Sequence, residues 1–442
     1  MTAAEVRIPR ARLIVALVGL AGCAAILLLA RGYTFYFDEW TFILSAPDWN
    51  ASTYLQSHNG HPAMLLRLIY SALLSTVGLR AYLSYMVVLL ALHAASVLFL
   101  FELVRRRAGD LIGLGFAAIL LVLGAGWENL LWAFQMSFVG SVAFGLAMLL
   151  ALDAPPSRRR MPLVVAMLAG SLMFSGVGLV FGIAAAVTLA ATRDRRKELV
   201  WLVPVAIVFA AWFIAYGRTG ATPDSSSTAS NLVVLPLYTL WGLGASAAGL
   251  IGEGGMFGPP LLVLAVGAVA FAWWRRSFEP RALGVAAGLV AFYLVIGLSR
   301  AELGYQQSGA GRYVYVGGVF WLLLLADAAA RLPWRGTWRP ATAACIFLAF
   351  FSSATLLFTF AVAKEVQMER ELADLQALAA ERGDPCLNPT GSVDPLVMPS
   401  VTEPALYYRA VDRYGDPAAS TQVVDKSSFE QARANLQIPG CK

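Results

Sequence analysis

Long apolar runs alternate with short basic clusters along most of the chain. An α-helix needs about 20 predominantly apolar residues to cross the core of a bilayer, and runs close to that length recur as far as position 362. The pattern predicts an all-α polytopic membrane protein with about eleven transmembrane helices. We expect these helices over 13–30, 82–104, 111–126, 133–152, a tight pair within 161–192, 199–216, 257–274, 282–298, 313–331 and 341–362.

The basic clusters set the expected orientation of these helices. Lys and Arg close to helix ends are retained on the cytoplasmic side, so an even number of crossings should join consecutive clusters. A cytoplasmic N-terminus and an extracytoplasmic C-terminus satisfy this rule. The segment 232–251 is also apolar, but a crossing there would put the next cluster outside, so we expect a re-entrant or interfacial helix. The clusters are Arg7, Arg10 and Arg12; Arg105, Arg106 and Arg107; Arg158, Arg159 and Arg160; Arg193, Arg195, Arg196 and Lys197; Arg275, Arg276 and Arg281; and Arg331, Arg335 and Arg339.

The composition agrees with a membrane protein and argues against nucleic acid as a partner. Hydrophobic residues make up 59% of the 442 residues and charged residues only 14%, far from the balance of a soluble domain. The formal net charge is +6, yet the arginines fall between apolar runs and form no continuous basic face of the kind that binds nucleic acid. We expect an integral protein of the plasma or inner membrane, in contact with membrane lipids.

The topology predicts two parts of the chain. A transmembrane module over 1–362 includes a first external loop, 31–81, with interfacial helices, and a small extracytoplasmic cap follows over 363–442. Cys386 and Cys441 fall in the cap, and because an outside location is oxidising we expect a disulfide between them, with two free thiols as the alternative. The cap is expected either to cover a cavity and help to select a substrate or to be purely structural.

Two adjacent carboxylates follow the first apolar run, in YTFYFDEWTFILS. If this stretch is a helix at the membrane interface, Asp38 and Glu39 are turned about 100° apart. One carboxylate can then enter a cavity while the other is anchored, and we take both as candidate catalytic residues. For Asp38, capping of a helix or contact with lipid headgroups is the alternative.

Two of the three histidines stand in HNGHPAMLLRL. The HxxH spacing of His58 and His61 invites a zinc interpretation, but no third strong ligand stands at helical spacing, and Pro62 breaks the element directly after the pair. We favour hydrogen bonds from both histidines to an anionic group. A divalent metal is the alternative, and we expect no cofactor.

The stretch GWENLLWAFQ places polar residues at the outer end of a span. An aromatic belt explains its tryptophans, but it does not explain a carboxylate on so short a turn. We take Glu128, Asn129 and Gln135 as candidate substrate-binding residues.

The stretch SRAELGYQQSGAGRYVYV carries two arginines outside the membrane, against the usual charge bias. The guanidinium groups of Arg300 and Arg312 suit phosphate oxygens, with snorkelling to headgroups as the alternative. Gln306 and Tyr313 accompany them as candidate substrate-binding residues.

Acids, arginines and histidines in one external cavity suit the transfer of a sugar from a polyprenyl phosphate. A carboxylate can take the proton of an acceptor hydroxyl as it attacks the anomeric carbon, and cationic groups can stabilise the departing phosphate. The lipid tail of such a donor would explain why the enzyme is built into a bilayer. We therefore predict an inverting membrane glycosyltransferase of cell-envelope glycan biosynthesis, whose acceptor is a glycan, a lipid or a protein.

These features resemble the GT-C superfamily of membrane glycosyltransferases, which includes the protein O-mannosyltransferases and the aminoarabinose transferase of lipid A. The resemblance rests on FDEW after the first span, the following HP, an RRR cytoplasmic turn and a late external GRYVY. It covers the first 150 residues and the remainder mainly by topology. It implies a GT-C-like fold and a polyprenyl-phosphate donor.

The resemblance also implies roles for particular residues. The family's catalytic base falls on Asp38, the first carboxylate of the DE pair, and its second acid falls on Glu128. Its basic residues for the lipid phosphate match Arg300 and Arg312 by location. The first external loop has no counterpart of the family's phosphate-binding lysine.

Two other functions fit part of the same pattern. A ligase or polymerase that moves a whole glycan from a diphosphate carrier could use the same acids and arginines. A transporter or flippase of a lipid-linked glycan would need polar residues near the bilayer midplane and usually related halves. The predicted spans are apolar at their centres and show no internal repeat, which argues against transport.

Overall fold

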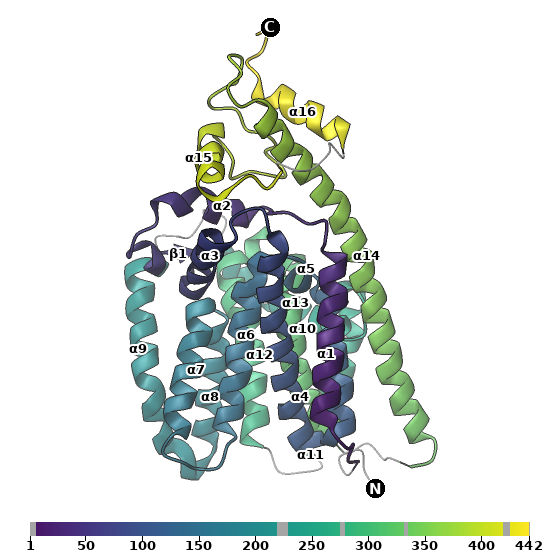
Figure 1. The fold of residues 1–442 in the computed structure, drawn as a ribbon. Coiled ribbons are helices and arrows are strands. Elements are labelled where there is room, and N and C mark those ends of the chain that lie inside the picture. The colour runs from purple at the N-terminus through teal and green to yellow at the C-terminus, as the bar shows by residue number, and fades with distance from the viewer. Residues whose placement is uncertain (1–5, 219–228, 275–278, 331–334, 419–424, 442) are drawn as a thin grey trace.

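The structure is a computed structural model that describes residues 6–218, 229–274, 279–330, 335–418 and 425–441. Upright helices form a bundle, short elements lie across one end of it, and a C-terminal segment rises above them (Figure 1). We call the end with the short elements the upper end; the N-terminus lies at the lower end. The short elements come from the first loop: α2 (Asp38–Ser45), α3 (Met64–Thr76) and the two-residue strands β1 (Ser57–His58) and β2 (His61–Pro62).

The helices of the bundle follow the apolar runs of the sequence. Nine helices of the described chain are long and apolar enough to cross a membrane, which confirms the prediction of an all-α polytopic membrane protein. They contain α1 (Ala11–Leu29), α4 (Tyr82–Leu121), α6 (Met136–Leu152), α9 (Val203–Trp212), α10 (Ala229–Gly249), α11 (Gly258–Trp274), α12 (Pro280–Arg300), α13 (Gly311–Ala329) and α14 (Trp338–Ala380).

Helix α4 is a hairpin that crosses the bundle twice. The backbone reverses at Gly109, which has φ 81° and ψ 174°, a conformation that only glycine adopts readily. The second half then runs back along the first, so that Nε2 of His93 lies 3.2 Å from the carbonyl oxygen of Leu121. The reversal separates the two helices that the sequence predicted over 82–104 and 111–126.

The tight pair predicted within 161–192 consists of α7 (Arg160–Phe174) and α8 (Gly178–Ala191). At 1.5 Å per residue, helices of 15 and 14 residues are about 22 Å long, shorter than the hydrocarbon core of roughly 30 Å. Their connecting turn therefore stops short of the upper end of the longer helices.

Helix α10 has both ends at the upper end of the bundle. Near its start, Nδ2 of Asn231 donates to the carbonyl oxygen of Leu298 at 3.1 Å, close to the end of α12. Near its end, Gly249 packs closely against Val314, at the start of α13. The re-entrant or interfacial placement expected for 232–251 agrees with these contacts. The reversal within α4 and the placement of both ends of α10 at the upper end agree with the arrangement expected for these two segments.

The described residues of the predicted basic clusters gather at the lower end, where several arginines are paired with acids. Arg275, Arg276 and Arg331 of these clusters lie outside the described residues. These pairs join neighbouring helices and fix their lower ends. They are Arg12 with Glu102, Arg105 with Asp110, Arg107 with Asp327, Arg160 with Glu198 and Arg281 with Asp153.

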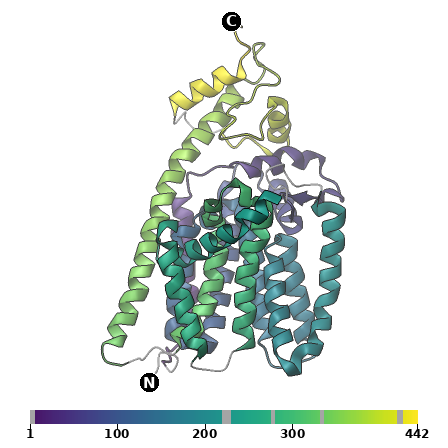
Figure 2. The ribbon, with the colours of Figure 1, turned by 180° about the vertical axis from the view of Figure 1, so that it is seen from behind.

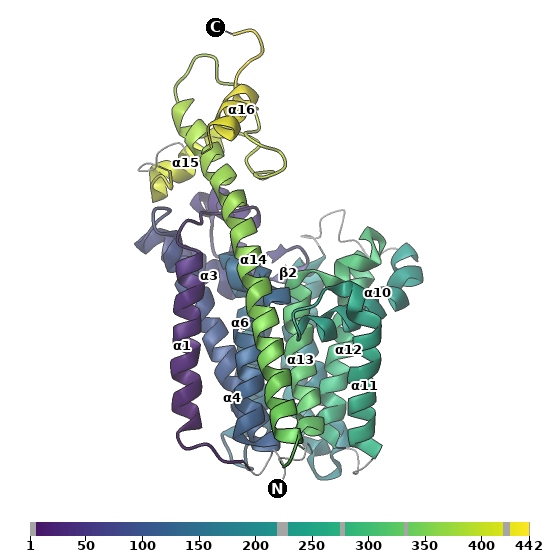
Figure 3. The same ribbon diagram turned by 90° about the vertical axis from the view of Figure 1, so that its right-hand side faces the viewer.

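The C-terminal segment begins as a direct continuation of the last crossing. Helix α14 runs unbroken from the lower end of the bundle to well above the first loop (Figure 3), so the chain has no break at the predicted boundary near 362. Above the bundle, α15 (Pro404–Tyr414) covers α2, and α16 (Lys426–Leu436) packs on α14. Cys386 and Cys441 form a disulfide with a Cα–Cα distance of 5.6 Å.

Helices α9 and α14 stand at opposite edges of the bundle (Figures 1 and 2). None of the residues of α9 is buried, although nearly all of them are apolar. Its upper end is tied to the first loop, because Nε1 of Trp212 donates to the carbonyl oxygen of Leu55 at 2.7 Å. Both apolar helices therefore present large surfaces to lipid.

Candidate active site

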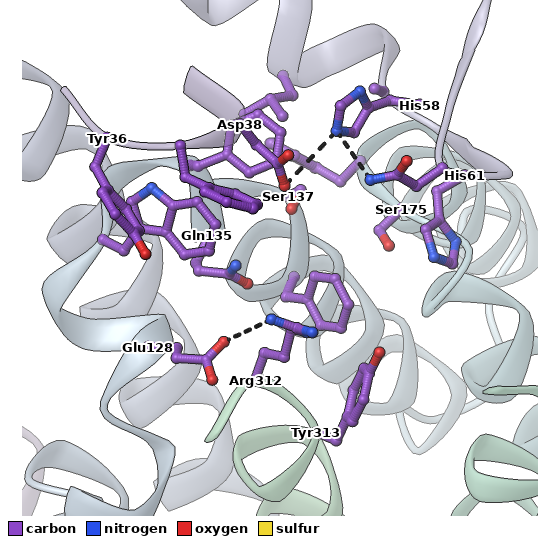
Figure 4. A pocket seen from close by; sticks show the side chains of 18 of the residues that line it. Tyr36, Asp38, His58, His61, Glu128, Gln135, Ser137, Ser175, Arg312 and Tyr313 are labelled. Atoms are coloured by element: carbon purple, nitrogen blue, oxygen red, sulfur yellow. Dashed lines mark hydrogen bonds and ion pairs between the residues drawn. The ribbon is translucent and has the colours of Figure 1, made fainter. Parts of the chain in front are cut away.

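A cavity of about 410 Å³ lies beneath the first loop at the upper end. Its walls come from segments far apart in the sequence, including α2, the β1–β2 hairpin, the turn between α7 and α8, the upper ends of α12 and α13, and the middle of α14. In Figure 4 the labelled side chains of α2, the hairpin, the α7–α8 turn and α13 lie around one space. The lining residues include Tyr36, Phe37, Asp38, His58, His61, Trp127, Glu128, Trp132, Phe134, Gln135, Ser137, Phe138, Phe174, Ser175, Arg300, Arg312, Tyr313 and Lys364.

Asp38 is the first residue of α2 and lines the cavity. Its side chain is 26% exposed, and its Oδ2 lies 3.9 Å from Nε2 of His58. The residue before it, Phe37, has φ 49° and ψ −114°, a strained conformation for a bulky side chain. This sharp entry into α2 turns Asp38 toward the cavity.

Glu39 points away from the cavity and is fully buried. It accepts hydrogen bonds from the hydroxyl of Tyr70 at 2.7 Å and from the backbone N–H of Tyr36 at 3.0 Å. Burial raises the pKa of Glu39 to about 7, although these hydrogen bonds oppose the shift. The sequence offered both carboxylates as candidates, one in a cavity and the other anchored. One helical step of about 100° carries Glu39 into the protein interior, and it does not line the cavity.

His58 and His61 face each other across the β1–β2 hairpin. The two residues between them, Asn59 and Gly60, have φ 51° and 78°, as a two-residue Asn-Gly hairpin turn requires. The HxxH pair is therefore not helical, and the Asn-Gly dipeptide was the sequence signal for this turn. Among the described residues, no group of three His, Cys, Asp or Glu side chains is arranged to hold a metal ion.

The ring of His61 is held in its neutral form. Burial lowers the pKa of His61 to about 4, and the nearby charges of Arg300, His58 and Arg312 act in the same direction. The α7–α8 turn packs against this ring so closely that a Cβ on Gly176 would lie 2.7 Å from Nδ1. Because α7 and α8 are short, their turn forms the floor of the cavity instead of filling it.

Glu128 and Arg312 form an ion pair on the opposite wall. Nη1 of Arg312 donates to Oε2 of Glu128 at 3.0 Å, and the two side chains are 28% and 14% exposed for the arginine and the glutamate. The guanidinium also lies 5.1 Å from the centre of the Tyr313 ring. Arg300, the last residue of α12, also lines the cavity. The two late arginines thus share one cavity with Asp38.

Of the other predicted substrate-binding residues, two line the cavity and two do not. Gln135 and Tyr313 line the cavity. Asn129, in the short helix α5 (Glu128–Leu131), is completely buried and does not line the cavity, because the helix turns its side chain inward. Gln306 is exposed and also lies outside the cavity lining, since its 3-10 turn, Tyr305–Gly309, directs it outward. The structure therefore does not bring these two candidates to the cavity.

Lys364 of α14 lines the cavity and was missed from the sequence. Its side chain is buried, with Nζ 3.2 Å from the centre of the Tyr36 ring and a 3.0 Å hydrogen bond to Oε1 of Gln367. The available signal was its place as a lone lysine just after the last apolar run. The lysine of the cavity therefore comes from the last crossing helix and not from the first loop.

Comparison with known proteins finds a similar solved structure. No protein-family model and no curated protein matches the sequence. The chain is similar to the crystal structure of ArnT from Cupriavidus metallidurans bound to undecaprenyl phosphate, with 18% sequence identity and a TM-score of 0.48, over 95% of this chain and 76% of that chain. A similarity of this size assigns no residue role and no substrate to the present chain.

Proposed function

We propose that this chain is a membrane glycosyltransferase that moves a sugar from a polyprenyl-phosphate donor to an acceptor hydroxyl. The observation that carries the proposal is the meeting of one carboxylate and two arginines in one cavity: Asp38 from the first loop, and Arg300 and Arg312 from the helices α12 and α13. The cavity lies at the upper end of an apolar bundle, where a lipid-linked donor can present its head group.

Asp38 is suited to act as the general base. In the proposed step, its carboxylate takes the proton of the acceptor hydroxyl as the hydroxyl oxygen forms a bond to the anomeric carbon. The bond from that carbon to the phosphate oxygen breaks, and its electron pair leaves with the phosphate. Asp38 later releases the proton to water. A single displacement of this kind inverts the anomeric carbon.

The departing phosphate is suited to the cationic side of the cavity. Arg300 and Arg312 can donate charge-assisted hydrogen bonds to its oxygens, and the rings of His58 and His61 can add N–H donors. Lys364 supplies a further buried positive charge on the side of Tyr36. With these cations the phosphate can leave as an anion, so the proposed step invokes neither a general acid nor a metal ion.

The sugar itself is suited to the aromatic and amide part of the lining. Trp127, Trp132 and Phe134 offer apolar faces, and Gln135 offers an amide beside them. Gln135 is 3% exposed, and its Oε1 has no hydrogen-bond partner among the described residues. A buried acceptor without a partner is costly, and a hydroxyl or amino group of the sugar could satisfy it.

The lipid tail of the donor has an apolar surface available at the edge of the bundle. Helix α9 has no buried side chain and reaches the first loop a few residues before His58, at the contact of Trp212 with Leu55. A polyprenyl chain lying along α9 would keep its isoprene units in the lipid phase while its phosphate enters the cavity.

We further propose that the upper end faces the outside of a plasma or inner membrane. The arginine clusters at the lower end favour a cytoplasmic location there, which puts the N-terminus inside and the C-terminal segment outside. The disulfide between Cys386 and Cys441 suits an oxidising compartment. Donor and acceptor would then meet on the outer side, as in the assembly of cell-envelope glycans.

Purified protein in detergent or nanodiscs should release free polyprenyl phosphate from one member of a panel of polyprenyl-phosphate sugars when an acceptor extract is supplied. Mass spectrometry of both lipid and acceptor follows the transfer. The matched controls are Asp38→Asn, expected to be inactive, and Asp412→Asn, an exposed aspartate on α15 that is paired with Arg382 and is expected to be active. Turnover of polyprenyl-diphosphate glycans alone would instead favour the ligase or polymerase.

A further inference from the structure

Three consecutive residues at the start of α2 point in three directions. Asp38 faces the cavity, Glu39 is anchored in the bundle through Tyr70 of α3, and Trp40 faces the C-terminal segment. Successive residues of a helix are turned by about 100°, so three neighbours can reach three different surroundings. The placement of the proposed base thus depends on two anchors, one on each side.

Trp40 is the anchor on the side of the C-terminal segment. It is fully buried, and its Nε1 donates to Oε1 of Glu371 on α14 at 2.9 Å and to the carbonyl oxygen of Phe35 at 3.2 Å. Its ring packs against that of Tyr407 on α15, with centroids 5.6 Å apart. A single side chain of α2 therefore contacts both helices that lie above the cavity.

Glu371 is an unusual choice of residue for a purely structural contact. It is fully buried, and its Oε2 has no hydrogen-bond partner in the described part of the chain. Burying a carboxyl group with only one of its oxygens satisfied costs free energy that an apolar side chain of similar size would not cost. What the carboxyl group offers in return is a directed acceptor that sets the position of the Trp40 indole.

Further contacts join the segment 31–81 to the C-terminal segment, one of them from α2 itself. Thr41 Oγ1 lies 2.8 Å from Ser400 Oγ, and the backbone N–H of Leu79 donates to the carbonyl oxygen of Tyr414 at 3.0 Å. Helix α2 has only eight residues, and a helix of that length is not stable alone. Its position is therefore set by the surfaces that clamp it.

We infer that Glu371 is a positioning residue for the proposed base: by fixing Trp40 it fixes α2, and with it Asp38. The C-terminal segment is then part of the catalytic arrangement and not a passive cover. This inference rests on the proposed function. A displacement of a reacting group by about 1 Å can cost roughly 100-fold in rate, so loosening α2 acts mainly on the chemical step.

The test compares Glu371→Leu, which removes the acceptor, with Glu371→Gln, whose amide oxygen can still accept from the indole. With a polyprenyl-phosphate sugar that the wild type turns over, Glu371→Leu should lower kcat about 10- to 100-fold with little change in the donor KM, and Glu371→Gln should restore most of it. Trp40→Phe should match Glu371→Leu, and the double variant should be no worse than either single variant. The control is Glu369→Leu, on the exposed face of the same helix.

Hydrogen exchange gives a second measurement that needs no substrate. The amides of 38–45 should exchange faster in Glu371→Leu and in Trp40→Phe than in the wild type or in Glu369→Leu. The inference is overturned if kcat per folded enzyme stays within about two-fold of wild type while exchange in α2 is unchanged, or if Glu371→Gln is as impaired as Glu371→Leu. Loss of the proposed function would appear differently, as continued turnover by Asp38→Asn.

Discussion

Nη1 of Arg312 donates to Oε2 of Glu128 at 3.0 Å, joining two residues that are 184 positions apart in the sequence. The carboxylate holds the guanidinium at the cavity wall before any donor is bound. Arg312→Ala should raise the donor KM about 10- to 100-fold, since a charge-assisted hydrogen bond contributes roughly 1.5–3 kcal/mol. Glu128→Gln should not raise it, because the arginine is then free for phosphate.

Binding of a polyprenyl-phosphate sugar to purified protein checks both variants. The control is Arg382→Ala, a partly exposed arginine of the C-terminal segment. If Glu128→Gln weakens donor binding as much as Arg312→Ala does, the arginine does not bind phosphate independently of its partner.

The buried carboxyl group of Glu39 should make stability depend on pH. Its pKa is raised from 4.5 to about 7 in the folded protein, so between these values the folded state holds a proton that the unfolded state releases. Its contribution to the free energy of unfolding is complete below about pH 4.5 and is lost as the pH rises through 7. The free energy of unfolding should fall by up to roughly 3 kcal/mol over this range. Glu39→Gln cannot ionise, so its unfolding temperature should fall less than that of wild type over this range.

Thermal unfolding in detergent at a series of pH values gives the difference between the two proteins. Subtracting one curve from the other removes the contributions of groups that titrate in both proteins. A difference that does not vary between about pH 4.5 and 7.5 would mean that the carboxyl group of Glu39 does not titrate as its burial requires.

His61 should couple donor binding to proton uptake. Its pKa is lowered to about 4 in the free protein, and an anionic phosphate beside the ring would raise it. The complex should therefore take up a proton as the pH falls toward the pKa of His61 in the complex. Donor affinity should increase as the pH falls. The phosphodiester itself stays singly charged over this range, so the effect belongs to the protein. His61→Gln should flatten the dependence, and an unchanged slope in titration calorimetry would exclude this histidine.

Gln135 should discriminate between sugars. Its buried Oε1 lacks a partner among the described residues, and a sugar that donates to it gains a hydrogen bond worth about 1 kcal/mol or more. Gln135→Leu should lower kcat/KM for that sugar by roughly 10- to 100-fold and have much less effect on the matching deoxy sugar. Gln306→Leu, outside the cavity, is the control. Equal losses with both sugars would remove Gln135 from sugar recognition.

Much of the fold follows from the apolar pattern, because a segment that crosses a bilayer must be long enough to span it and must satisfy its backbone hydrogen bonds internally. The hairpin in α4 was predictable from its RRR cluster, and α10 was predictable from the positions of the arginines on either side of it. The β1–β2 hairpin was not predicted, although its Asn-Gly pair is a recognised turn signal, because strands of two residues are too short to leave an alternating pattern in the sequence.

The candidate site was predictable in its location and only partly in its members. Topology alone brings Asp38, Arg300 and Arg312 to the same end of the bundle. It does not fix the direction of a side chain, which is why the sequence left both Asp38 and Glu39 as candidates. Lys364 enters the site through the tilt and packing of α14, and neither leaves a periodic signal in the sequence.

The most direct test of the central claim is to measure donor binding and transfer on the same preparation of Asp38→Asn. The amide is nearly isosteric with the carboxylate but cannot take a proton, so polyprenyl-phosphate sugar should bind with wild-type affinity while the first turnover slows by about 100-fold or more. Transfer at the wild-type rate, with the donor bound equally well, would contradict the account.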